Sequence, residues 1–358
     1  MLSRSGQFKH YRDDYFKLKK ENNDLKKELD SLNSQIEYLE KQILKNSKEN
    51  SLNKIRNEDF SNLKIAIKSP SPKNSNNWGD FFFALALKKS FEKKGFAVEI
   101  HEKEDWYGNY DDIDINFVLR GYSEFEVSSD KINIMWNISH PDWISNEEYE
   151  KYDLVFISSI KYAEKIGKEI NTPVRPLLQC CDPEVFFPEY SEDCKEEILF
   201  VGTARGHIFR PIVKDAMITG HNVAIYGSAW DEFLDEKDIK ANYIPNEEVH
   251  KYYSSCKILL NDHWQTMKIN DFPSNRLFDA FACGAFIISD NFPSAELLFD
   301  GNLVTYDTVD DLNEKLNYYL THDEERMSKA QKGREIVLKN HTFDNRVDTI
   351  LNTLKTDI

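Results

Sequence analysis

The sequence predicts an α/β protein with two doubly wound, Rossmann-like domains that follow an N-terminal coiled-coil helix. Apolar residues recur every seven positions near the start, which is typical of a coiled coil. From residue 63, short apolar runs alternate with helical patterns, as in proteins with parallel sheets. The length of 358 residues, 40% of them hydrophobic, suffices for two separate cores.

The N-terminal repeat consists of two interleaved series, offset by four residues: Leu18, Leu25, Leu32 and Leu39, then Asn22, Leu29, Ile36 and Ile43. Leucine at d and Asn22 at an a position favour a parallel two-stranded coiled coil, and Glu21 with Lys26 is placed for an ion pair between the helices. We therefore expect residues 1–50 to make the protein a homodimer. The alternative is one amphipathic helix that lies on its own domain. The polar stretch at 51–62 predicts a linker.

The first domain is predicted at residues 63–185 and the second at 186–340, with a C-terminal helix at 341–358. In the first domain, the expected strands are residues 63–68, 97–101, 115–119, 132–138, 153–158 and 174–178. In the second, they are residues 198–202, 223–226, 241–244, 258–261, 286–289 and 303–306. Such open sheets bind ligands at the carboxyl ends of their strands, so the loops there are the places to search for a site.

The net charge of −16 is unevenly distributed. Residues 1–58 hold 13 Lys and Arg against 10 Asp and Glu, so this segment is at +3 and the remainder at −19. A body this acidic is unsuited to nucleic acid, whose affinity rests on phosphate contacts. The basic segment could contact an anionic membrane surface, although a solvated helix face explains the same charges.

The cysteines and the apolar runs indicate a soluble, cytoplasmic protein. The five cysteines are odd in number and show no C-x-x-C spacing, which favours reduced thiols over disulfides or a zinc site. The first residues contain no apolar signal region, and the longest apolar run, residues 81–87, is too short to span a bilayer.

The stretch DFPSNRLFDAFACGAF follows a predicted strand and begins a helix. Ser274 or Asp271 could cap that helix, and the amides of Ser274, Asn275 and Arg276 would form an anion site, to which the Arg276 guanidinium adds charge. Asp271 and Asp279 could then hold sugar hydroxyls and a ribose diol. A plain cap and a surface carboxylate would fit the same residues.

This stretch, the following IISD and the segment ELLFDGNLVTYDTVDDLNEKLNYYL resemble the C-terminal domain of GT-B fold glycosyltransferases. The resemblance is to the group 1 family of the E-x7-E type, close to the spore-maturation-protein-like glycosyltransferases. Asp271 and Asp279 have the spacing of the two glutamates that many retaining members carry. The resemblance implies that Asp279 contacts the ribose and that Asp271 contacts the donor sugar, with a side chain one methylene shorter than glutamate.

Three more segments resemble donor-binding parts of that family. VGTARGHIFRP resembles the glycine loop that binds the donor diphosphate, which implies roles for Gly202, Arg205 and Arg210; either arginine alone would be an ordinary surface residue. AIYGSAW, with Tyr226, matches a loop that lines the nucleotide pocket. IPNEEVHKYYSSCKILLN begins with Ile244, which corresponds to a backbone contact with the nucleobase.

In the first domain, SPSPKNSNNWGDFFFALALKKSFEKKG resembles the family's first loop, which approaches the donor phosphate and the acceptor. Gly79 would permit close backbone approach, and Asp80 is either a helix cap, which general preference favours, or a base for the acceptor. INIMWNISHPDW places His140 beyond a strand, like a histidine that contacts the donor sugar in related retaining enzymes. A histidine there could also simply cap a turn.

The resemblance implies a hexosyltransferase-like enzyme that moves a sugar from a UDP or GDP donor to a glycan, a lipid-linked acceptor or a protein, with retention of configuration. It also implies polysaccharide biosynthesis in the cytoplasm, with peripheral contact at the inner face of the membrane left open. No D-x-D motif follows a suitable strand, so we expect no metal and no cofactor besides the nucleotide sugar. Inversion would need Asp80 or His140 as a base. The alternatives are a sugar-nucleotide epimerase or hydrolase, and a non-catalytic coiled-coil scaffold with a vestigial site.

Overall fold

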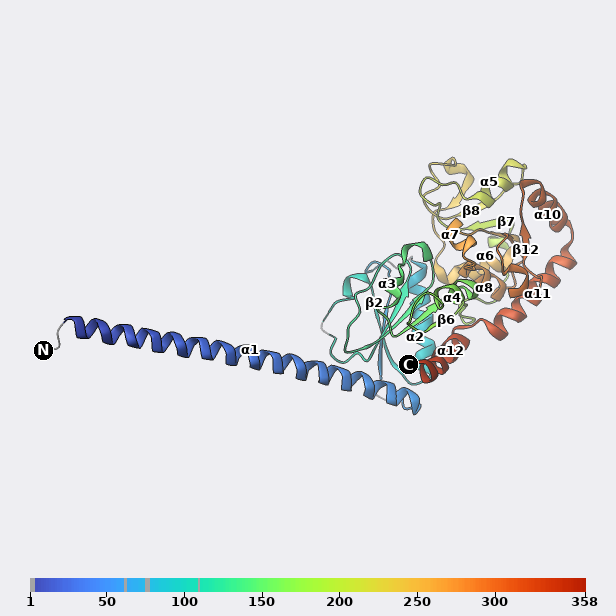
Figure 1. Ribbon diagram of the computed structural model, residues 1–358. Helices are drawn as coiled ribbons and strands as arrows, with labels where there is room; N and C mark the ends of the chain where they lie inside the picture. The colour runs from blue at the N-terminus through green and yellow to red at the C-terminus, as the bar shows by residue number, and fades with distance from the viewer. Residues whose placement is uncertain (1–3, 61–62, 75–77, 109) are drawn as a thin grey trace.

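The structure is a computed structural model that describes residues 4–60, 63–74, 78–108 and 110–358. A single long helix, α1 (Arg4–Arg56), projects from a body of two α/β domains, and only its C-terminal end touches that body (Figure 1). No helix in these four ranges is both long enough and apolar enough to cross a bilayer.

The first domain is built on a parallel sheet with the strand order β2-β1-β3-β4-β5-β6. Its strands are β1 (Lys64–Lys68), β2 (Ala97–His101), β3 (Ile115–Arg120), β4 (Ile132–Asn137), β5 (Leu154–Ile157) and β6 (Val174–Pro176). Its helices include α2 (Gly79–Lys93), α3 (Asn146–Tyr149), α4 (Ile160–Ile166) and the 3-10 turn η2 (Pro141–Trp143). Strands β3, β4 and β5 are buried along their whole length, as expected for a parallel sheet covered on both faces.

The second domain contains another parallel sheet, with the strand order β12-β11-β10-β7-β8-β9. The strands are β7 (Glu196–Val201), β8 (Ala224–Tyr226), β9 (Ile239–Ala241), β10 (Cys256–Asn261), β11 (Ile287–Asp290) and β12 (Val304–Tyr306). The helices are α5 (Pro211–Ile218), α6 (Val249–Ser255), α7 (Gln265–Ile269), α8 (Asn275–Ala282), α9 (Ala295–Leu298), α10 (Val309–Thr321) and α11 (Asp323–Asn340). In both sheets the strand order reverses direction near the first strand of the domain, which brings strand ends together at a binding crevice.

The last helix, α12 (Phe343–Asp357), returns from the second domain to the first (Figure 1). It starts with a capping box between Thr342 and Asn345, and its apolar face, including Val347 and Ile350, completes the core of the first domain. Arg346 donates to the carbonyl of Leu178 at 2.6 Å, on the segment that connects the domains. The two domains are therefore joined twice, which restricts how they can move against each other.

The helix α1 extends further than the sequence predicted. The prediction of a linker at 51–62 is wrong as far as Arg56, because this part of the chain is the last stretch of α1 and packs on the first domain. Ile55 is fully buried, and Ser51 Oγ donates to Asp114 at 2.7 Å. These contacts keep the segment helical although its composition is polar.

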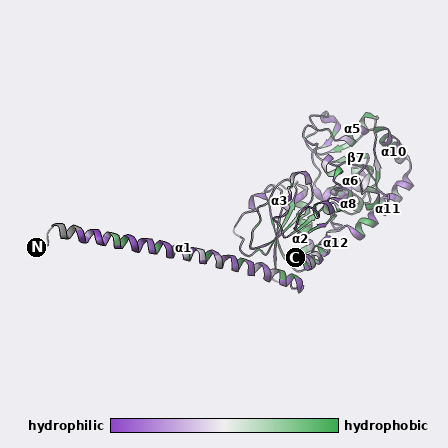
Figure 2. Ribbon diagram, in the orientation of Figure 1, coloured by the Kyte–Doolittle hydropathy of each residue, from purple (hydrophilic) through white to green (hydrophobic). Residues whose placement is uncertain are grey.

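The rest of α1 leaves its heptad side chains in solvent in this single chain. The apolar a and d residues are each more than half exposed: Tyr11, Tyr15, Leu18, Leu25, Leu29, Leu32, Ile36, Leu39 and Ile43. Figure 2 shows hydrophobic positions scattered among hydrophilic ones along the projecting helix. The coiled coil itself stays a prediction, and the alternative of a helix that lies on its own domain is wrong for this part of α1.

Each predicted strand overlaps an observed one. The largest shift is at 241–244, where the observed strand β9 (Ile239–Ala241) shares only Ala241 with the prediction. Beyond Ala241 the chain leaves the sheet because Ile244 turns its side chain into the core and Pro245 cannot continue a hydrogen-bonded ladder. The predicted helical character after residue 306 is confirmed by α10, α11 and α12.

Candidate functional site

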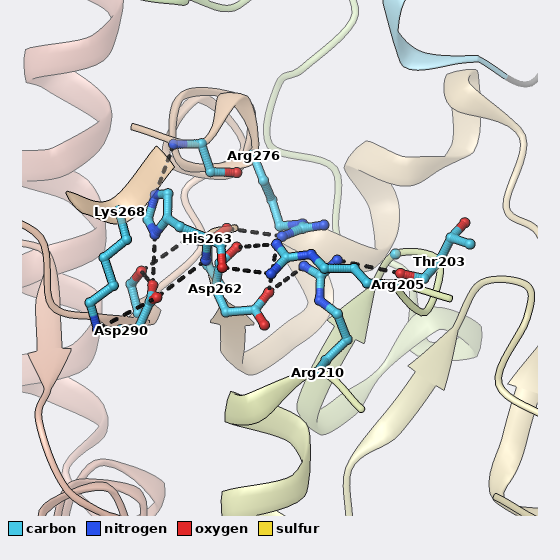
Figure 3. A network of polar contacts seen from close by, with 12 residues as sticks. Thr203, Arg205, Arg210, Asp262, His263, Lys268, Arg276 and Asp290 are labelled. Atoms are coloured by element: carbon cyan, nitrogen blue, oxygen red, sulfur yellow. Dashed lines mark hydrogen bonds and ion pairs between the residues drawn. The ribbon is translucent and has the colours of Figure 1, made fainter. Parts of the chain in front are cut away.

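Three arginines converge where β7 and β10 end (Figure 3). Arg205 and Arg210 lie in the loop between β7 and α5, and Arg276 is the second residue of α8. Arg210 Nη2 donates to Asp262 Oδ1, and Arg205 Nη2 lies 3.5 Å from the same oxygen. Arg276 Nη1 donates to Asn261 Oδ1 at 2.9 Å. Although the sequence separates them widely, the fold makes one group of these three predicted residues.

The arginine group carries more positive charge than its neighbours neutralise. Asp262 supplies a single negative charge to three guanidinium groups, two of which contact it directly. Burial, reinforced by the positive charges of Arg205 and Arg276, lowers the pKa of Arg210 to about 9. The Nε atoms of Arg205 and Arg210 are buried and have no hydrogen-bond partner in the described part of the chain. A bound anion would therefore relieve both repulsion and desolvation.

Aromatic rings support the same arginines. The guanidinium carbon of Arg205 lies 4.6 Å from the ring centroid of Trp264. Those of Arg210 and Arg276 lie 4.9 and 5.2 Å from the centroid of Phe200, on β7. Contacts of this kind hold a planar guanidinium in place without satisfying its hydrogen bonds. These ring contacts use none of the N–H donors of the three arginines.

A histidine connects this group to the start of α8. Ser274 donates its amide to His263 Nε2 at 2.9 Å, so the ring proton must be on Nδ1, which lies 2.6 Å from Asp290 Oδ1. The carbonyl of His263 accepts from Arg205 Nη1 at 2.5 Å. Ser274 occupies the N-cap position as predicted, but its side chain makes no capping bond in the described structure. Its amide is engaged by protein, which leaves fewer donors for an anion than the sequence indicated.

Sequence reasoning missed Asp262, His263, Trp264 and Asp290, although a signal was present. The run DHW stands directly after the strand β10, at the carboxyl end where ligands bind in such sheets. Polar and aromatic residues at the carboxyl end of a strand indicate a binding site as strongly as the arginines do.

Asp271 has a different environment from the one implied by the resemblance. Its φ of 61° is left-handed, and its side chain is buried. Oδ1 accepts from the amide and the hydroxyl of Ser294, at 2.9 and 2.8 Å, at the N-cap of α9. This carboxylate therefore caps α9 and not the helix α8 that follows it in sequence. These contacts favour a structural role over a contact with the donor sugar.

Asp279 lines a cavity of about 550 Å³ between the two domains. Asn275 lies beside it and donates Nδ2 to Asp279 Oδ2 at 2.8 Å, while Asn275 Oδ1 is buried without a partner in the described residues. Burial raises the pKa of Asp279 well above its ordinary value, although Asn275 and Arg276 act in the opposite direction. A carboxylate and an amide with unused capacity are suited to a diol.

The opposite wall of this cavity is the first turn of α2, with Gly79 and Asp80. A Cβ at Gly79 would meet no described atom within 4 Å, so the backbone is open to the cavity. The prediction that Asp80 caps the helix is wrong, because Trp78 holds the N-cap position and Asp80 is the second residue of the helix. Burial raises the pKa of Asp80 to about 6. Such a carboxylate can accept a proton near neutral pH.

His140 lies just before η2 in a left-handed conformation, with φ of 53°. Its ring is buried and contacts Trp264 of the second domain, at 5.6 Å between centroids. Nδ1 is buried and has no partner among the described atoms. Burial lowers the pKa of His140 below its ordinary value, and the charges of Arg120 and Arg205 act in the same direction, against Asp142. The structure thus brings His140 to the arginine group, across the domain boundary.

The remaining predicted residues are Gly202, a closely packed glycine, and Tyr226 and Ile244, which belong to the core of the second domain. A Cβ on Gly202 would lie 2.8 Å from Arg276 Nη2, so glycine is needed for Arg276 to reach its place. Tyr226 and Ile244 are buried in the core of the second domain, and the hydroxyl of Tyr226 donates to Glu196 at 3.1 Å. Their side chains do not line the cavity between the domains, which leaves only their backbones for a nucleotide.

Two Rossmann-like domains that face each other across a cleft, with a last helix returning to the first domain, define the GT-B fold. Sucrose-phosphate synthase from Thermosynechococcus elongatus is similar over 82% of this chain and 99% of its own, with a TM-score of 0.59 and 11% identity. A DNA-modifying β-glucosyltransferase, studied with and without uridine diphosphoglucose, has a TM-score of 0.58 and 14% identity, over 82% of this chain and 99% of its own. Anabaena HepE, in complex with UDP and glucose, has a TM-score of 0.56 and 10% identity, over 82% of this chain and 100% of its own. At these identities the likeness concerns the fold.

Residues 205–352 match the family described as glycosyl transferase-like. The spore protein CgeB of Bacillus subtilis (strain 168) is 28% identical over 149 residues, which are 37% of this chain and 46% of that protein. The chain thus matches somewhat less than half the length of this relative. The resemblance to GT-B proteins of the spore-maturation group, which the sequence indicated, is confirmed.

Proposed function

We propose that this protein is a glycosyltransferase that moves a hexose from a nucleoside-diphosphate sugar to an acceptor. The observation that carries the proposal is the undercompensated group of Arg205, Arg210 and Arg276, which faces His140 across the two domains. Structures of the same fold have been determined with UDP and glucose or with UDP-glucose, which supports a nucleotide-sugar donor here.

In the proposed complex, the diphosphate lies against the three guanidinium groups and Asp279 holds the ribose diol. When the bond from the sugar to the phosphate breaks, negative charge grows on the departing diphosphate. Arginines that are already fixed by Phe200 and Trp264 stabilise that charge without reorganisation. Because this positive charge comes from side chains, we propose that no divalent cation is needed, and undiminished turnover in EDTA would support this.

We propose retention of anomeric configuration, as the resemblance implies. One observation favours the alternative: Asp80, whose pKa burial raises to about 6, lines the cavity and could deprotonate the acceptor of an inverting enzyme. Proton NMR of the first product formed from an α-linked donor distinguishes the two outcomes. An α-linked product means retention, and a β-linked product means inversion.

The central experiment is a thermal-shift screen of the full chain with UDP, GDP and their sugars, followed by product analysis. A nucleoside diphosphate that binds only the folded state should raise Tm. At 100 times its Kd it stabilises the folded state by roughly 3 kcal/mol. Transfer to an added acceptor supports the proposal. Free sugar or a changed sugar nucleotide as the sole product indicates the hydrolase or epimerase. No shift with any nucleotide at millimolar concentration indicates a scaffold with a vestigial site.

We further propose that α1 pairs with a second copy in a parallel coiled coil, which would cover its exposed a and d residues. The cysteines of the described chain are free, which fits the cytoplasmic location that we propose. The two sites of such a dimer would be joined through the helix segment that packs on each first domain.

A further inference from the structure

Three large aromatic side chains lie exposed around His140 on the first domain. Trp78, Tyr122 and Trp143 expose 38%, 48% and 52% of their surface. The ring of Tyr122 lies 6.2 Å from that of Trp78 and 5.4 Å from that of Trp143, in both cases edge to face. The His140 ring is 4.5 Å from Tyr122 and 4.4 Å from Trp143. We call Trp78, Tyr122 and Trp143 the aromatic cup.

A buried ion pair holds two sides of the cup together. Arg120 and Glu148 form a two-point pair, with N···O distances of 2.6 and 3.1 Å. Arg120 also donates to the carbonyl of Gly121 at 2.6 Å and to that of Trp143 at 3.2 Å. One guanidinium thus fixes the backbone before Tyr122 and the backbone of Trp143. The exposed rings are carried by loops that the interior makes rigid, which is typical of a binding site.

The cup lies beside the proposed reaction centre. Trp78 is the N-cap residue of α2, and Asp80 follows it on the first turn of that helix. The ring of His140, which contacts Tyr122 and Trp143, also lies 5.6 Å from the ring of Trp264. Trp264 in turn lies 4.6 Å from the guanidinium carbon of Arg205. The cup is therefore beside the arginine group and the carboxylate, and not on an outer face of the protein.

We propose that the aromatic cup binds the acceptor and that this acceptor is a carbohydrate. This inference rests on the proposed function. A pyranose ring has an apolar face of C–H groups that packs on indole and phenol rings, while its hydroxyls project sideways. The cup offers such rings, and polar residues adjoin them in the sequence: Ser139 precedes His140, and Asp142 precedes Trp143. A lipid tail would leave these polar groups unpaired.

In the transfer step, an acceptor hydroxyl oxygen forms a bond to C1 of the donor sugar, and the bond between C1 and the diphosphate oxygen breaks. The electron pair of the broken bond leaves with the nucleoside diphosphate, which also takes the hydroxyl proton when configuration is retained. The cup contributes by holding the acceptor ring so that one hydroxyl points at C1, which lowers the entropic part of the barrier.

The test exposes the full chain, with UDP present, to an oligosaccharide array, and then measures each bound glycan in solution by tryptophan fluorescence. The variants are Tyr122→Ala and Trp143→Ala, and Tyr190→Ala, whose ring is 60% exposed elsewhere on the surface, is the matched control. We expect at least one glycan to bind, roughly tenfold more weakly in each cup variant, which corresponds to about 1.4 kcal/mol. The control should bind like the wild type.

Thermal shift with UDP and GDP on the same samples separates the two proposals. An intact nucleotide shift without any bound glycan overturns the carbohydrate acceptor, and so does a glycan that binds equally well to the cup variants. Binding of phospholipid vesicles or of peptides that depends on the cup also overturns it. A glycan that depends on the cup, without any nucleotide shift, overturns the proposed function and leaves the cup as a sugar-binding site.

Discussion

The ring of His140 lies 5.6 Å from the ring of Trp264, and this contact joins the two domains. Trp264 also contacts the guanidinium of Arg205, whose central carbon lies 4.6 Å from the indole centroid. One indole therefore separates the buried histidine of the first domain from the anion site of the second. The position of the domains relative to each other sets the distance from His140 to a bound diphosphate, and domain closure would change it.

His140→Ala should reduce turnover much more than nucleotide affinity. The imidazole is in the first domain, whereas the arginines and Asp279 that would bind the nucleotide are in the second. Loss of a group that acts near the reacting sugar costs roughly a hundredfold in kcat. Steady-state kinetics and nucleotide thermal shift measure the two effects. His322→Ala, an exposed histidine stacked on Tyr318, is the control, and a normal kcat in His140→Ala would refute the assignment.

Arg276→Gln should weaken nucleotide-diphosphate binding by roughly 10- to 100-fold, since a charge-assisted hydrogen bond contributes about 1.5–3 kcal/mol. This arginine is the best one to remove because its partner is the amide of Asn261, so no buried carboxylate is left alone. Arg210→Met would leave Asp262 with one partner fewer and would confuse binding with folding.

The matched control for Arg276 is Arg334→Gln. Arg334 donates to the carbonyl of Ala282 at 3.1 Å, at the opposite end of the same helix α8. Titration calorimetry with UDP and GDP should show no change of affinity in this control. Equal affinities of the wild type and Arg276→Gln would mean that the diphosphate binds elsewhere.

The architecture and part of the site could be predicted because parallel sheets give strong local signals. Strands buried on both faces appear as uninterrupted apolar runs, such as LVFI at β5. Residues at the carboxyl ends of such strands meet in space, which is why the sequence could bring Arg205 and Arg276 together. Neither inference needs knowledge of distant contacts.

The partners of single side chains could not be predicted, because they depend on backbone geometry and distant loops. The spacing of Asp271 and Asp279 gave no sign that Asp271 would turn left-handed and bond to Ser294, 23 residues later. The end of α1 was misjudged for a similar reason. Its composition is polar, and the contact of Ser51 with Asp114 that keeps it helical is 63 residues distant in sequence.

Asp80→Asn should stabilise the protein without ligand at pH 8 and about half as much at pH 5. The folded-state pKa of Asp80 is raised to about 6, above the ordinary value near 4, so the folded state holds this proton more tightly than the unfolded state. Stability therefore falls as the pH rises from about 4 to about 6. Above pH 6 the carboxylate is charged in its partly buried position, and the whole loss of stability is present. Asparagine carries no charge, so Asp80→Asn removes this loss of stability.

Thermal unfolding of wild type and Asp80→Asn across this pH range measures the effect, with the exposed Asp111→Asn as the control. If Asp80 is also the base of an inverting reaction, the acid limb of kcat/KM, with an apparent pKa near 6, should vanish together with most of the activity. If the difference in Tm between the wild type and Asp80→Asn were the same at pH 5 and pH 8, the pKa of Asp80 would not be raised in the folded state.

Deletion of residues 1–45 should convert a dimer to a monomer that still binds nucleotide. The exposed heptad residues end at Ile43, and the contacts of α1 with the first domain begin at Lys48, which pairs with Asp153 at 2.6 Å. Cutting between them removes the proposed interface and keeps Ser51 and Ile55 in place. Light scattering of the full and shortened chains measures the mass, and thermal shift with UDP and GDP reports on the site.

A substitution inside the helix tests the kind of pairing. Asn22→Leu should stabilise the assembly and allow higher oligomers, because a polar a residue selects the two-stranded parallel register at a cost in stability. Lys41→Ala, which removes an exposed pair with Glu37 away from the a and d positions, should leave the mass unchanged. A full chain that is monomeric at micromolar concentration, or a shortened chain that is still dimeric, would exclude pairing through α1.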